Sequence, residues 1–467
     1  MKNRIYIKDL NKHIGEEVNI ACFVDVRRDQ GKLVFFDFRD MSGKAQGVIL
    51  PNNKEAHEIA TPIRTEWVLE VNGKVNGRPE KNIQKEKQNG DIELEILGIK
   101  VLNEAETAPF DVTSDGRELG EEIRLKYRYL DLRRDRMQKN LRSRHSIIKH
   151  IRDYFSNEDF IEVETPILTK STPEGARDYV VPSRLYQGKF YALPQSPQQY
   201  KQLLMVGGVE KYFQIARCMR DEDTRGDRQP EFTQLDIEMA FAEEEDIMAM
   251  NEKLLIEIVG KFYPEKKIQQ IPFPRITYKE AMEKYNSDRP DIRTDKNDPN
   301  LLAFCWVVDF PFFEKTEDGG WTFTHNPFSA SKPKDAEKIM EKKDIGSILA
   351  AQYDIVLNGY EIGGGSIRNH RPEALVKVLE ILGHEEKKIQ ENFGHMLSAF
   401  SYGAPPHGGI AWGLDRLMML LQGEDSIREV IAFPKTGEGR DLMMDSPSEI
   451  ESKQLKELGI TVKEPKK

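Results

Sequence analysis

The stretch "RDEDTRGDRQPEFTQLD" at residues 220–236 brings three arginines, six carboxylates and one aromatic ring, Phe232, into one short segment. The apolar segments "YFQIA" (212–216) and "LDIEMAF" (235–241) flank it and are typical of two strands. The pattern predicts an antiparallel hairpin whose long loop and shoulders carry the charges. Arginine binds phosphate in a bidentate manner, and Phe232 can stack on a purine, so a nucleoside triphosphate suits this hairpin. Taken alone, the stretch is more often a charged surface hairpin.

Two further stretches favour a nucleotide-binding hairpin over a charged surface hairpin. "YDIVLNGYEIGGGSIRNH" (353–370) carries Asp354 and Glu361 on strand-like segments, which suits a magnesium pair, and its glycines permit close backbone approach. "GGIAWGLDRLMMLL" (408–421) is a glycine-rich strand-to-helix passage with Arg416 near the helix start, where arginine can reach a terminal phosphate. Either stretch alone is more often a turn or a buried helix. Together, the three stretches predict a nucleotide site that lacks the GxxxxGK[ST] phosphate loop.

Composition places the chain among globular proteins. It has 467 residues, enough for two or three domains, with 38% hydrophobic and 32% charged residues. The start has no apolar signal segment and no apolar run approaches bilayer-spanning length, so we expect a cytoplasmic protein without a membrane partner. The net charge of -10 argues against nucleic-acid binding over the whole surface but permits a local basic groove.

The three cysteines are far apart in sequence. Cys22, Cys218 and Cys305 form no CxxC pair, which excludes a disulfide framework and disfavours a zinc site of the usual spacing. Each is interpreted as a small buried hydrophobic residue.

Residues 1–105 have the pattern of a five-stranded barrel of the OB type. The predicted strands, separated by turn residues and one helical interruption near 53–65, are 18–26, 32–39, 45–50, 67–75 and 91–102. Arg28, Phe35 and Gln46 would lie on the face where OB barrels read unpaired bases. A lone aromatic residue on a strand more often belongs to a core, so this pattern alone favours a packing module.

The rest of the chain reads as a linker, 106–133, followed by one large α+β or α/β domain, 134–467. Apolar residues between Met137 and Phe155 recur on one helical face. A strand over 160–168, ended by Pro166, follows this helix, and another helix is predicted over 246–262.

These motifs resemble a known family. The Pro166 segment, the 220–236 hairpin and the "GLDR" helix (413–416) are similar to the three signature motifs of class II aminoacyl-tRNA synthetases, and the barrel resembles the anticodon-binding domain of their aspartate, asparagine and lysine subgroup. "STPEGARDY" (171–179), "LPQSPQQYKQLL" (193–204) and "GGGSIR" (363–368) are similar to the bacterial, aspartate-specific members. The resemblance covers nearly the whole chain.

The resemblance implies an α+β multidomain protein: an N-terminal five-stranded OB barrel, then an antiparallel sheet flanked by helices, in a homodimer with Pro166 near the interface. It implies ATP-dependent activation of L-aspartate to aspartyl-adenylate and transfer to the 3′ end of tRNA-Asp. The alternative is a non-discriminating enzyme that also aspartylates tRNA-Asn.

The family's ATP-site roles fall on residues of the three stretches. Arg220 would hold the α-phosphate, Arg416 the γ-phosphate, and Glu361 with Asp354 would bind Mg²⁺; Arg220, Arg416 and Glu361 are the implied catalytic residues. Phe232 would stack on adenine, and Glu222 would contact adenine or the tRNA end. The remaining implied ATP-site residues are Asp221, Gly413 and Asp415.

The implied aspartate site surrounds the amino acid with charges. Lys201 and Arg368 would pair with the side-chain carboxylate, and a buried positive pair should reject asparagine because its neutral amide leaves those charges uncompensated. Glu174, Ser196, Gln198 and Asp236 would surround the α-ammonium, with the Glu174 segment as a flexible lid. The implied site also includes Gln234 and His325.

The resemblance implies tRNA contacts in two places, the barrel and the loop of the 220–236 hairpin. Arg28, Phe35 and Gln46 match positions that bind the anticodon in relatives, which reverses the packing interpretation above. Thr224, Arg225 and Asp227 would meet the acceptor end of the tRNA.

Three positions depart from the bacterial pattern. The insertion domain between the second and third motifs is absent near 294–300, and Asn326 stands where relatives often have a second histidine. Gln30 replaces a residue that helps separate strict from relaxed tRNA specificity, whereas "EKN" (80–82) resembles the strict type, so we expect a strict enzyme. A tRNA-independent amide-forming paralogue typically lacks the barrel. A non-catalytic relative should have lost Arg220, Glu361 or Arg416.

Overall fold

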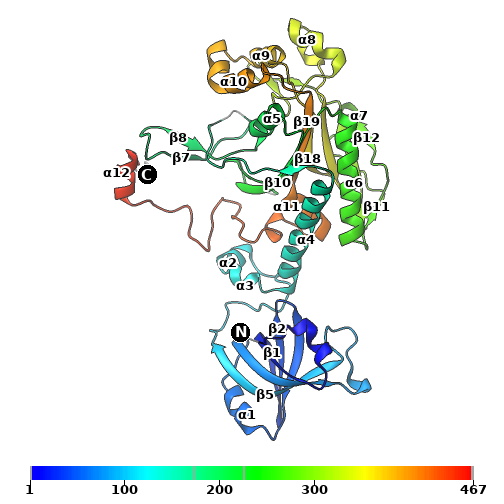
Figure 1. Cartoon of the computed structure of the whole chain (residues 1–467), viewed down its shortest axis with the longest axis vertical. Coiled ribbons are helices and arrows are strands. Elements are labelled where there is room, and N and C mark those ends of the chain that lie inside the picture. Colours follow the sequence, from blue (N-terminus) through cyan, green and yellow to red (C-terminus); the bar gives the residue numbers. More distant parts are fainter. Residues whose placement is uncertain (1–2, 172–173, 225–226, 464–467) are drawn as a thin grey trace. The chain divides into compact units, whose positions relative to one another are not determined.

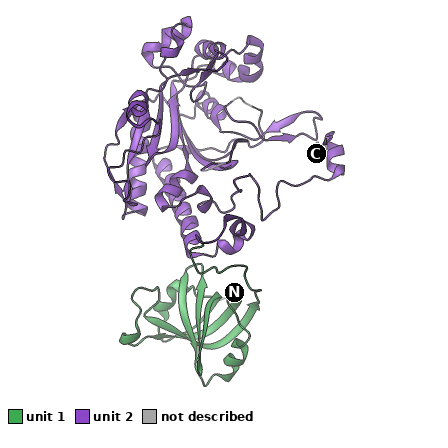
Figure 2. Ribbon diagram, turned by 180° about the vertical axis from the view of Figure 1, so that it is seen from behind, with its two compact units in different colours: residues 1–116 green, residues 117–467 purple. Residues whose placement is uncertain are grey.

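The computed structural model describes residues 3–171, 174–224 and 227–463 (Figure 1). The chain divides into two compact units, residues 1–116 and residues 117–467 (Figure 2). The division falls inside the predicted linker, whose second half forms the short helices α2 (Glu121–Lys126) and α3 (Arg128–Asp131).

The first unit is a closed five-stranded barrel with strand order β1-β2-β3-β5-β4, as the alternating pattern predicts. Its strands are β1 (Glu17–Gln30), β2 (Leu33–Asp40), β3 (Gly43–Ile49), β4 (Val68–Gly77) and β5 (Ile92–Asn103). Its helical pieces are η1 (Ile7–His13), α1 (Lys54–Ala60) and η2 (Glu80–Asn82). Alternate residues of β1, among them Ile20, Cys22 and Val24, are buried in the barrel core, while their neighbours face outward.

The second unit is built on an eight-stranded sheet with order β12-β14-β17-β18-β19-β10-β9-β6. The pairings from β14 through β9 are antiparallel, and only the outermost strands β12 and β6 pair in parallel. The central strands are β14 (Phe304–Val308), β17 (Gln352–Leu357), β18 (Tyr360–Ile367), β19 (His407–Gly413), β10 (Glu231–Ala240) and β9 (Lys211–Met219). The outer strands are β12 (Arg275–Thr277) and β6 (Ile161–Glu162).

The two faces of this sheet differ in polarity. Paired residues of antiparallel strands share a face, and the register places Asp236, Ala411, Gly364 and Asp354 in one row across four strands. The next row of the same face consists of Glu238, Gly409, Ser366 and Gln352. The residues between these positions face the opposite side and are fully buried in the main core: Leu235, Ile237, Ile355, Ile410 and Trp412. The sheet therefore has one apolar face and one polar face.

Three helices, labelled in Figure 1, supply buried residues to the core on the apolar face. They are α4 (Asp135–Asn157), α6 (Glu244–Phe262) and α11 (Leu414–Gln422). The predicted helices over 137–155 and 246–262 are confirmed. Helix α6 begins with a capping box, in which Glu243 and Asp246 satisfy each other's backbone N–H groups.

The remaining elements complete the second unit. The helices are α5 (Gln198–Val206), α7 (Tyr278–Tyr285), α8 (Ala336–Glu341), α9 (Pro372–Ile381), α10 (Glu386–Phe400) and α12 (Ser452–Leu458). The 3-10 turns are η3 (Pro333–Asp335), η4 (Ile345–Ser347) and η5 (Ile427–Glu429). Three two-stranded sheets pair β7 (Val180–Pro182) with β8 (Phe190–Ala192), β11 (Lys267–Ile268) with β13 (Leu301–Leu302), and β15 (Phe313–Lys315) with β16 (Trp321–Phe323).

The strand predicted over 160–168 is wrong beyond its first residues, because β6 ends at Glu162. Val163 still donates one hydrogen bond to the Phe213 carbonyl oxygen at 3.2 Å. Pro166 has no N–H to continue the ladder, and the segment leaves the sheet.

The connection between α7 and β13 covers residues 286–300 and is bound by the side chain of Gln269. The amide of Gln269 donates to the Ile292 carbonyl oxygen at 3.0 Å and accepts from the Thr294 N–H at 2.8 Å. Gln269 thus anchors the middle of this connection. Among the described residues, no helix is both long and apolar enough to cross a membrane.

Candidate active site

A cavity of about 280 Å³ lies over the polar face where the three charged stretches meet. The β9–β10 hairpin, β18, β19 and the start of α11 all contribute to its wall. The lining residues that the sequence singles out are Arg220, Glu222, Thr224, Asp227, Phe232, Gln234, Glu361, Gly413, Asp415 and Arg416. The structure therefore brings together most of the predicted ATP-site residues.

Arg416 is positioned by α11, which begins directly after β19 and places this side chain in its first turn. Its Nε atom lies 2.7 Å from the Oδ2 atom of Asp227, and its Nη1 atom donates to the carbonyl oxygen of Glu361. The arginine expected to hold the γ-phosphate is thus engaged by a carboxylate of the hairpin loop.

Arg220 and Phe232 lie against each other. The guanidinium carbon is 5.1 Å from the centre of the ring, within the range of a cation–π contact, and Nε donates to the Gln195 carbonyl oxygen at 3.4 Å. The guanidinium covers one face of the ring expected to stack on adenine.

Asp415 lines the cavity, but both of its carboxylate oxygens bind protein groups. Oδ1 accepts from Arg144 of α4 at 2.5 Å, and Oδ2 accepts from the Thr233 N–H of β10 at 2.9 Å. These contacts favour a bracing role between α11, α4 and β10 over direct ATP binding. Asp221 is not among the lining residues and lies 3.6 Å from Arg177.

Asp354 and Glu361 form a pair of acids beside the cavity. Burial, followed by the charge of Glu361, raises the pKa of Asp354 well above its ordinary value. Two carboxylates at close quarters suit a Mg²⁺ ion, which binds proteins through one or two carboxylates together with substrate phosphates. Among the described residues, no group of three or more potential metal ligands occurs.

Four buried charges form the centre of the polar face. Lys201 lies 2.8 Å from Asp236 and 3.2 Å from Glu238, and Arg368 binds Glu238 through two hydrogen bonds of 2.9 and 3.1 Å. All four side chains are at most 2% exposed. Burial opposes ionisation of Glu238, but Arg368 and Lys201 outweigh it and lower its pKa to about 2.

This cluster corrects one expectation. Lys201 and Arg368 are not uncompensated charges, because Asp236 and Glu238 balance them. Sequence reasoning missed Glu238, although it lies two residues after Asp236 on β10 and hence on the same face. Gly409 makes room for it, since a Cβ atom there would lie 2.1 Å from the Glu238 Oε2 atom.

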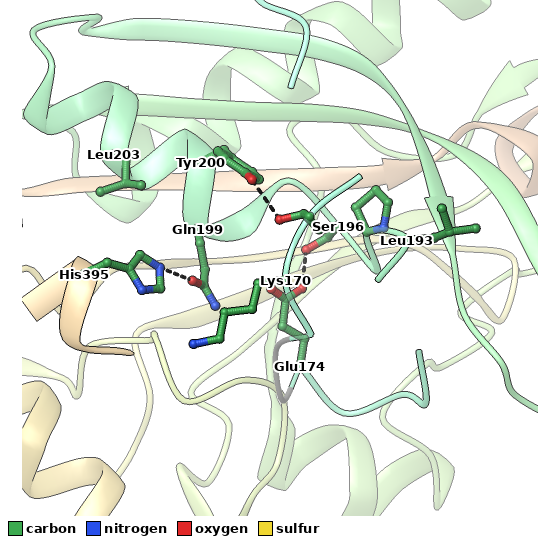
Figure 3. Close-up of a pocket in the computed structure, with 10 residues that line it drawn as sticks. Lys170, Glu174, Leu193, Ser196, Gln199, Tyr200, Leu203 and His395 are labelled. Carbon is green, nitrogen blue, oxygen red and sulfur yellow. Dashed lines mark hydrogen bonds between the residues drawn. The ribbon is translucent and has the colours of Figure 1, made fainter. Parts of the chain in front are cut away.

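The residues expected around the α-ammonium partly contact each other. Ser196 donates to Glu174 at 2.8 Å, and the Gln198 N–H donates to the Ser196 hydroxyl at 3.3 Å. Glu174 and Ser196 also line a second cavity of about 270 Å³ between α5 and α10 (Figure 3). There the His395 ring lies 2.7 Å from the Gln199 side chain.

His325 lies over the glycine segment of β18. Its Nε2 atom is 3.1 Å from the position that a Cβ atom of Gly364 would occupy. Burial, followed by the positive charges of Arg368, Arg220 and Lys201, lowers the pKa of His325 to about 4. The imidazole is therefore neutral at physiological pH.

The barrel carries its own cavity of about 590 Å³, lined by Phe35 and Gln46. Gln46 accepts from Arg78 at 2.5 Å, and Arg28, opposite Phe35 in the register, binds Asp37 through two hydrogen bonds of 2.8 Å. Lys81 and Asn82 of the "EKN" stretch also line it, as do Arg78 and Glu93, which were not singled out from the sequence.

The hairpin residues expected at the tRNA acceptor end face inward. Thr224 donates to the Gly437 carbonyl oxygen and, like Asp227, lines the cavity of about 280 Å³ beside Arg416. Arg225 lies outside the described residues.

The fold and the site define a class of protein. Residues 120–437 match the family described as class II tRNA synthetases (D, K and N), and residues 18–102 match the OB-fold nucleic acid binding domain. The chain belongs to the class II tRNA synthetase family.

Curated relatives are similar over almost the whole chain. The aspartate–tRNA(Asp/Asn) ligase of Rubrobacter xylanophilus is 40% identical over 574 residues, covering 96% of this chain and 95% of that protein. The aspartate–tRNA ligase of Staphylococcus saprophyticus is 39% identical over 576 residues, covering 96% and 97%. Because these alignments are longer than the 467-residue chain, the relatives contain residues that it lacks.

Solved structures share the fold. The asparaginyl-tRNA synthetase of Pyrococcus horikoshii, complexed with asparaginyl-adenylate, has a TM-score of 0.76 at 23% identity and covers 93% of this chain and 99% of that one. The aspartyl-tRNA synthetase of Entamoeba histolytica has a TM-score of 0.72 at 23% identity, covering 92% and 91%.

Proposed function

We propose that the chain is an aspartate–tRNA ligase, which activates L-aspartate with ATP and transfers it to the 3′ end of tRNA-Asp. The observation that carries this proposal is the identity of about 40% with curated aspartate–tRNA ligases over 96% of the chain. The buried cluster of Lys201, Arg368, Asp236 and Glu238 supports the choice of amino acid.

In the first step, the α-carboxylate of aspartate attacks the α-phosphorus of ATP, and pyrophosphate leaves. The substrate supplies the nucleophile, so the protein contributes alignment and charge stabilisation. Arg220 is assigned to the α-phosphate and Arg416 to the γ-phosphate. Asp354 and Glu361 would hold Mg²⁺, which neutralises phosphate charge when it is bound.

Selection of aspartate follows from hydrogen-bond direction. The Lys201 ammonium and the Arg368 guanidinium can only donate, so they suit the two acceptor oxygens of a carboxylate. The amide of asparagine would present an N–H₂ group to one of these donors, and the missing acceptor would leave a buried donor unpaired. Asp236, on the same face, is assigned to the α-ammonium.

The second step requires tRNA. We assign the barrel cavity with Phe35 and Gln46 to the anticodon, and Thr224, Arg225 and Asp227 to the acceptor end after the hairpin loop opens. Strict charging of tRNA-Asp is our first reading. The second candidate is charging of both tRNA-Asp and tRNA-Asn, which the names of several relatives favour. Equal rates with the two purified tRNAs would establish the second.

We propose a homodimer that acts in the cytoplasm, where its family works. Ile161, Pro166, Ile167 and Leu168 are exposed in one segment beside β6, and exposed apolar runs of this kind mark interfaces. Sedimentation equilibrium should give twice the chain mass, and Ile167→Glu should shift the protein toward the monomer.

The deciding experiment is ATP–pyrophosphate exchange measured with each amino acid in turn. Exchange should depend on aspartate and disappear in Arg220→Ala. Exchange driven by asparagine or lysine at a comparable rate would contradict the proposal.

A further inference from the structure

The amide of Asn326 has only one possible orientation. Its oxygen accepts from the backbone N–H of Phe328 at 2.9 Å, and a backbone N–H can only donate. The amide nitrogen is therefore the atom that lies 2.7 Å from the Nδ1 atom of His325. This contact assigns the amide orientation through the hydrogen-bond network.

The orientation of Asn326 decides where His325 carries its proton. An amide nitrogen only donates, so Nδ1 of His325 must accept. A neutral imidazole has one N–H, which then resides on Nε2. If both nitrogens were protonated, the Nδ1–H group would face the Asn326 N–H₂ group, and the two donors would repel each other. This repulsion opposes protonation of the ring, as burial and the nearby positive charges also do.

The Nε2–H group is left open on the polar face. Among the described residues, none accepts a hydrogen bond from it. It lies over Gly364, in the row that contains Asp236 and Asp354, and the Oδ1 atom of Asp354 is 2.8 Å from the same Gly364 Cβ position. The cations that act on the ring are Arg368, Arg220 and Lys201. A donor among three cations suits an anionic oxygen of the ligand.

We propose that Asn326 is a positioning residue that fixes His325 as the Nε2–H tautomer, so that the imidazole donates a hydrogen bond to a carboxylate oxygen of bound aspartate. The proposal rests on the proposed function for the identity of the ligand. The tautomer itself does not depend on that function.

The isosteric variant Asn326→Asp tests the proposal. One carboxylate oxygen still accepts from Phe328, whereas the other now accepts from Nδ1, so the ring proton moves to Nδ1. In the ligand-free full chain, nitrogen NMR at pH 7 should show Nε2–H in the wild type and Nδ1–H in Asn326→Asp, with His325→Gln identifying the signals. The KM for aspartate in exchange should rise roughly 10- to 100-fold, with the KM for ATP unchanged.

A double-mutant cycle separates tautomer control from a structural role. In His325→Gln the side-chain nitrogen replaces Nε2 as a donor and has no tautomer, so adding Asn326→Asp should raise the KM less than about threefold, within the usual additivity error. The proposal would be overturned if Asn326→Asp raised the KM for aspartate equally in the wild type and in His325→Gln. An Nδ1–H ring in the wild type would also overturn it, and that measurement does not depend on the folding of a variant. Loss of aspartate-dependent exchange in the wild type would instead contradict the proposed function and leave the NMR result standing.

Discussion

Arg416 and Asp227 form an ion pair, with Nε and Oδ2 separated by 2.7 Å, and both line the cavity assigned to ATP. The pair joins the arginine assigned to the γ-phosphate with a loop residue assigned to tRNA. A phosphate that binds Arg416 must therefore compete with a carboxylate of the protein.

Asp227→Asn should lower the KM for ATP roughly two- to fivefold, because removing a partly exposed competing charge yields at most about 1 kcal/mol. The measurement is ATP–pyrophosphate exchange at saturating aspartate. Asp318→Asn, an exposed aspartate in the β15–β16 turn, is the matched control and should change nothing. A raised KM for ATP would show that Asp227 supports Arg416 rather than competing with ATP.

Arg368→Lys should lower kcat/KM for aspartate roughly 10- to 100-fold while ATP binding persists, because lysine cannot reproduce the two-bond contact with Glu238. Isothermal titration with ATP and exchange kinetics with aspartate measure the two effects separately. Arg371→Lys, at an exposed position three residues further along, is the control. Unchanged aspartate kinetics would exclude Arg368 from selection.

Acid should destabilise the protein partly through His325. Its pKa is about 4 in the folded chain and 6.5 ordinarily, so the unfolded chain binds more protons between these values. This contribution to stability is present above pH 6.5 and is lost as the pH falls toward 4, by up to about 1.4 kcal/mol per pH unit. Thermal unfolding of His325→Gln should be less pH-dependent in that window, whereas the exposed His145→Gln should follow the wild type.

Phe35→Ala should raise the KM for tRNA-Asp roughly 5- to 100-fold, because one stacked base contributes about 1–3 kcal/mol. Aspartate activation without tRNA should be unaffected, since Phe35 lies in the barrel. Leu97→Ala, an exposed apolar position of the same barrel, is the control. An unchanged KM for tRNA would return Phe35 to a packing role.

The barrel and the β9–β10 hairpin could be predicted because period-two alternation and glycine-bounded turns are local signals. The charged residues of 220–236, 353–370 and 408–421 could be grouped into one site because each stretch suits a nucleotide or its phosphates. The partners of Asp415 could not be predicted, because Arg144 and Thr233 are 271 and 182 residues away in sequence. Glu238 could have been found, because it lies two residues after Asp236 on the same predicted strand. The early end of β6 depended on how the chain leaves the sheet at Pro166.

The charge balance of Lys201, Arg368, Asp236 and Glu238 also constrains evolution. Replacing any one member by a neutral residue leaves the buried cluster with an unbalanced charge, which costs several kcal/mol. A change in which amino acid the site selects therefore requires paired substitutions in this cluster. Each single substitution lowers the stability of the fold before any new specificity is gained. Strong epistasis among these four positions follows from their burial.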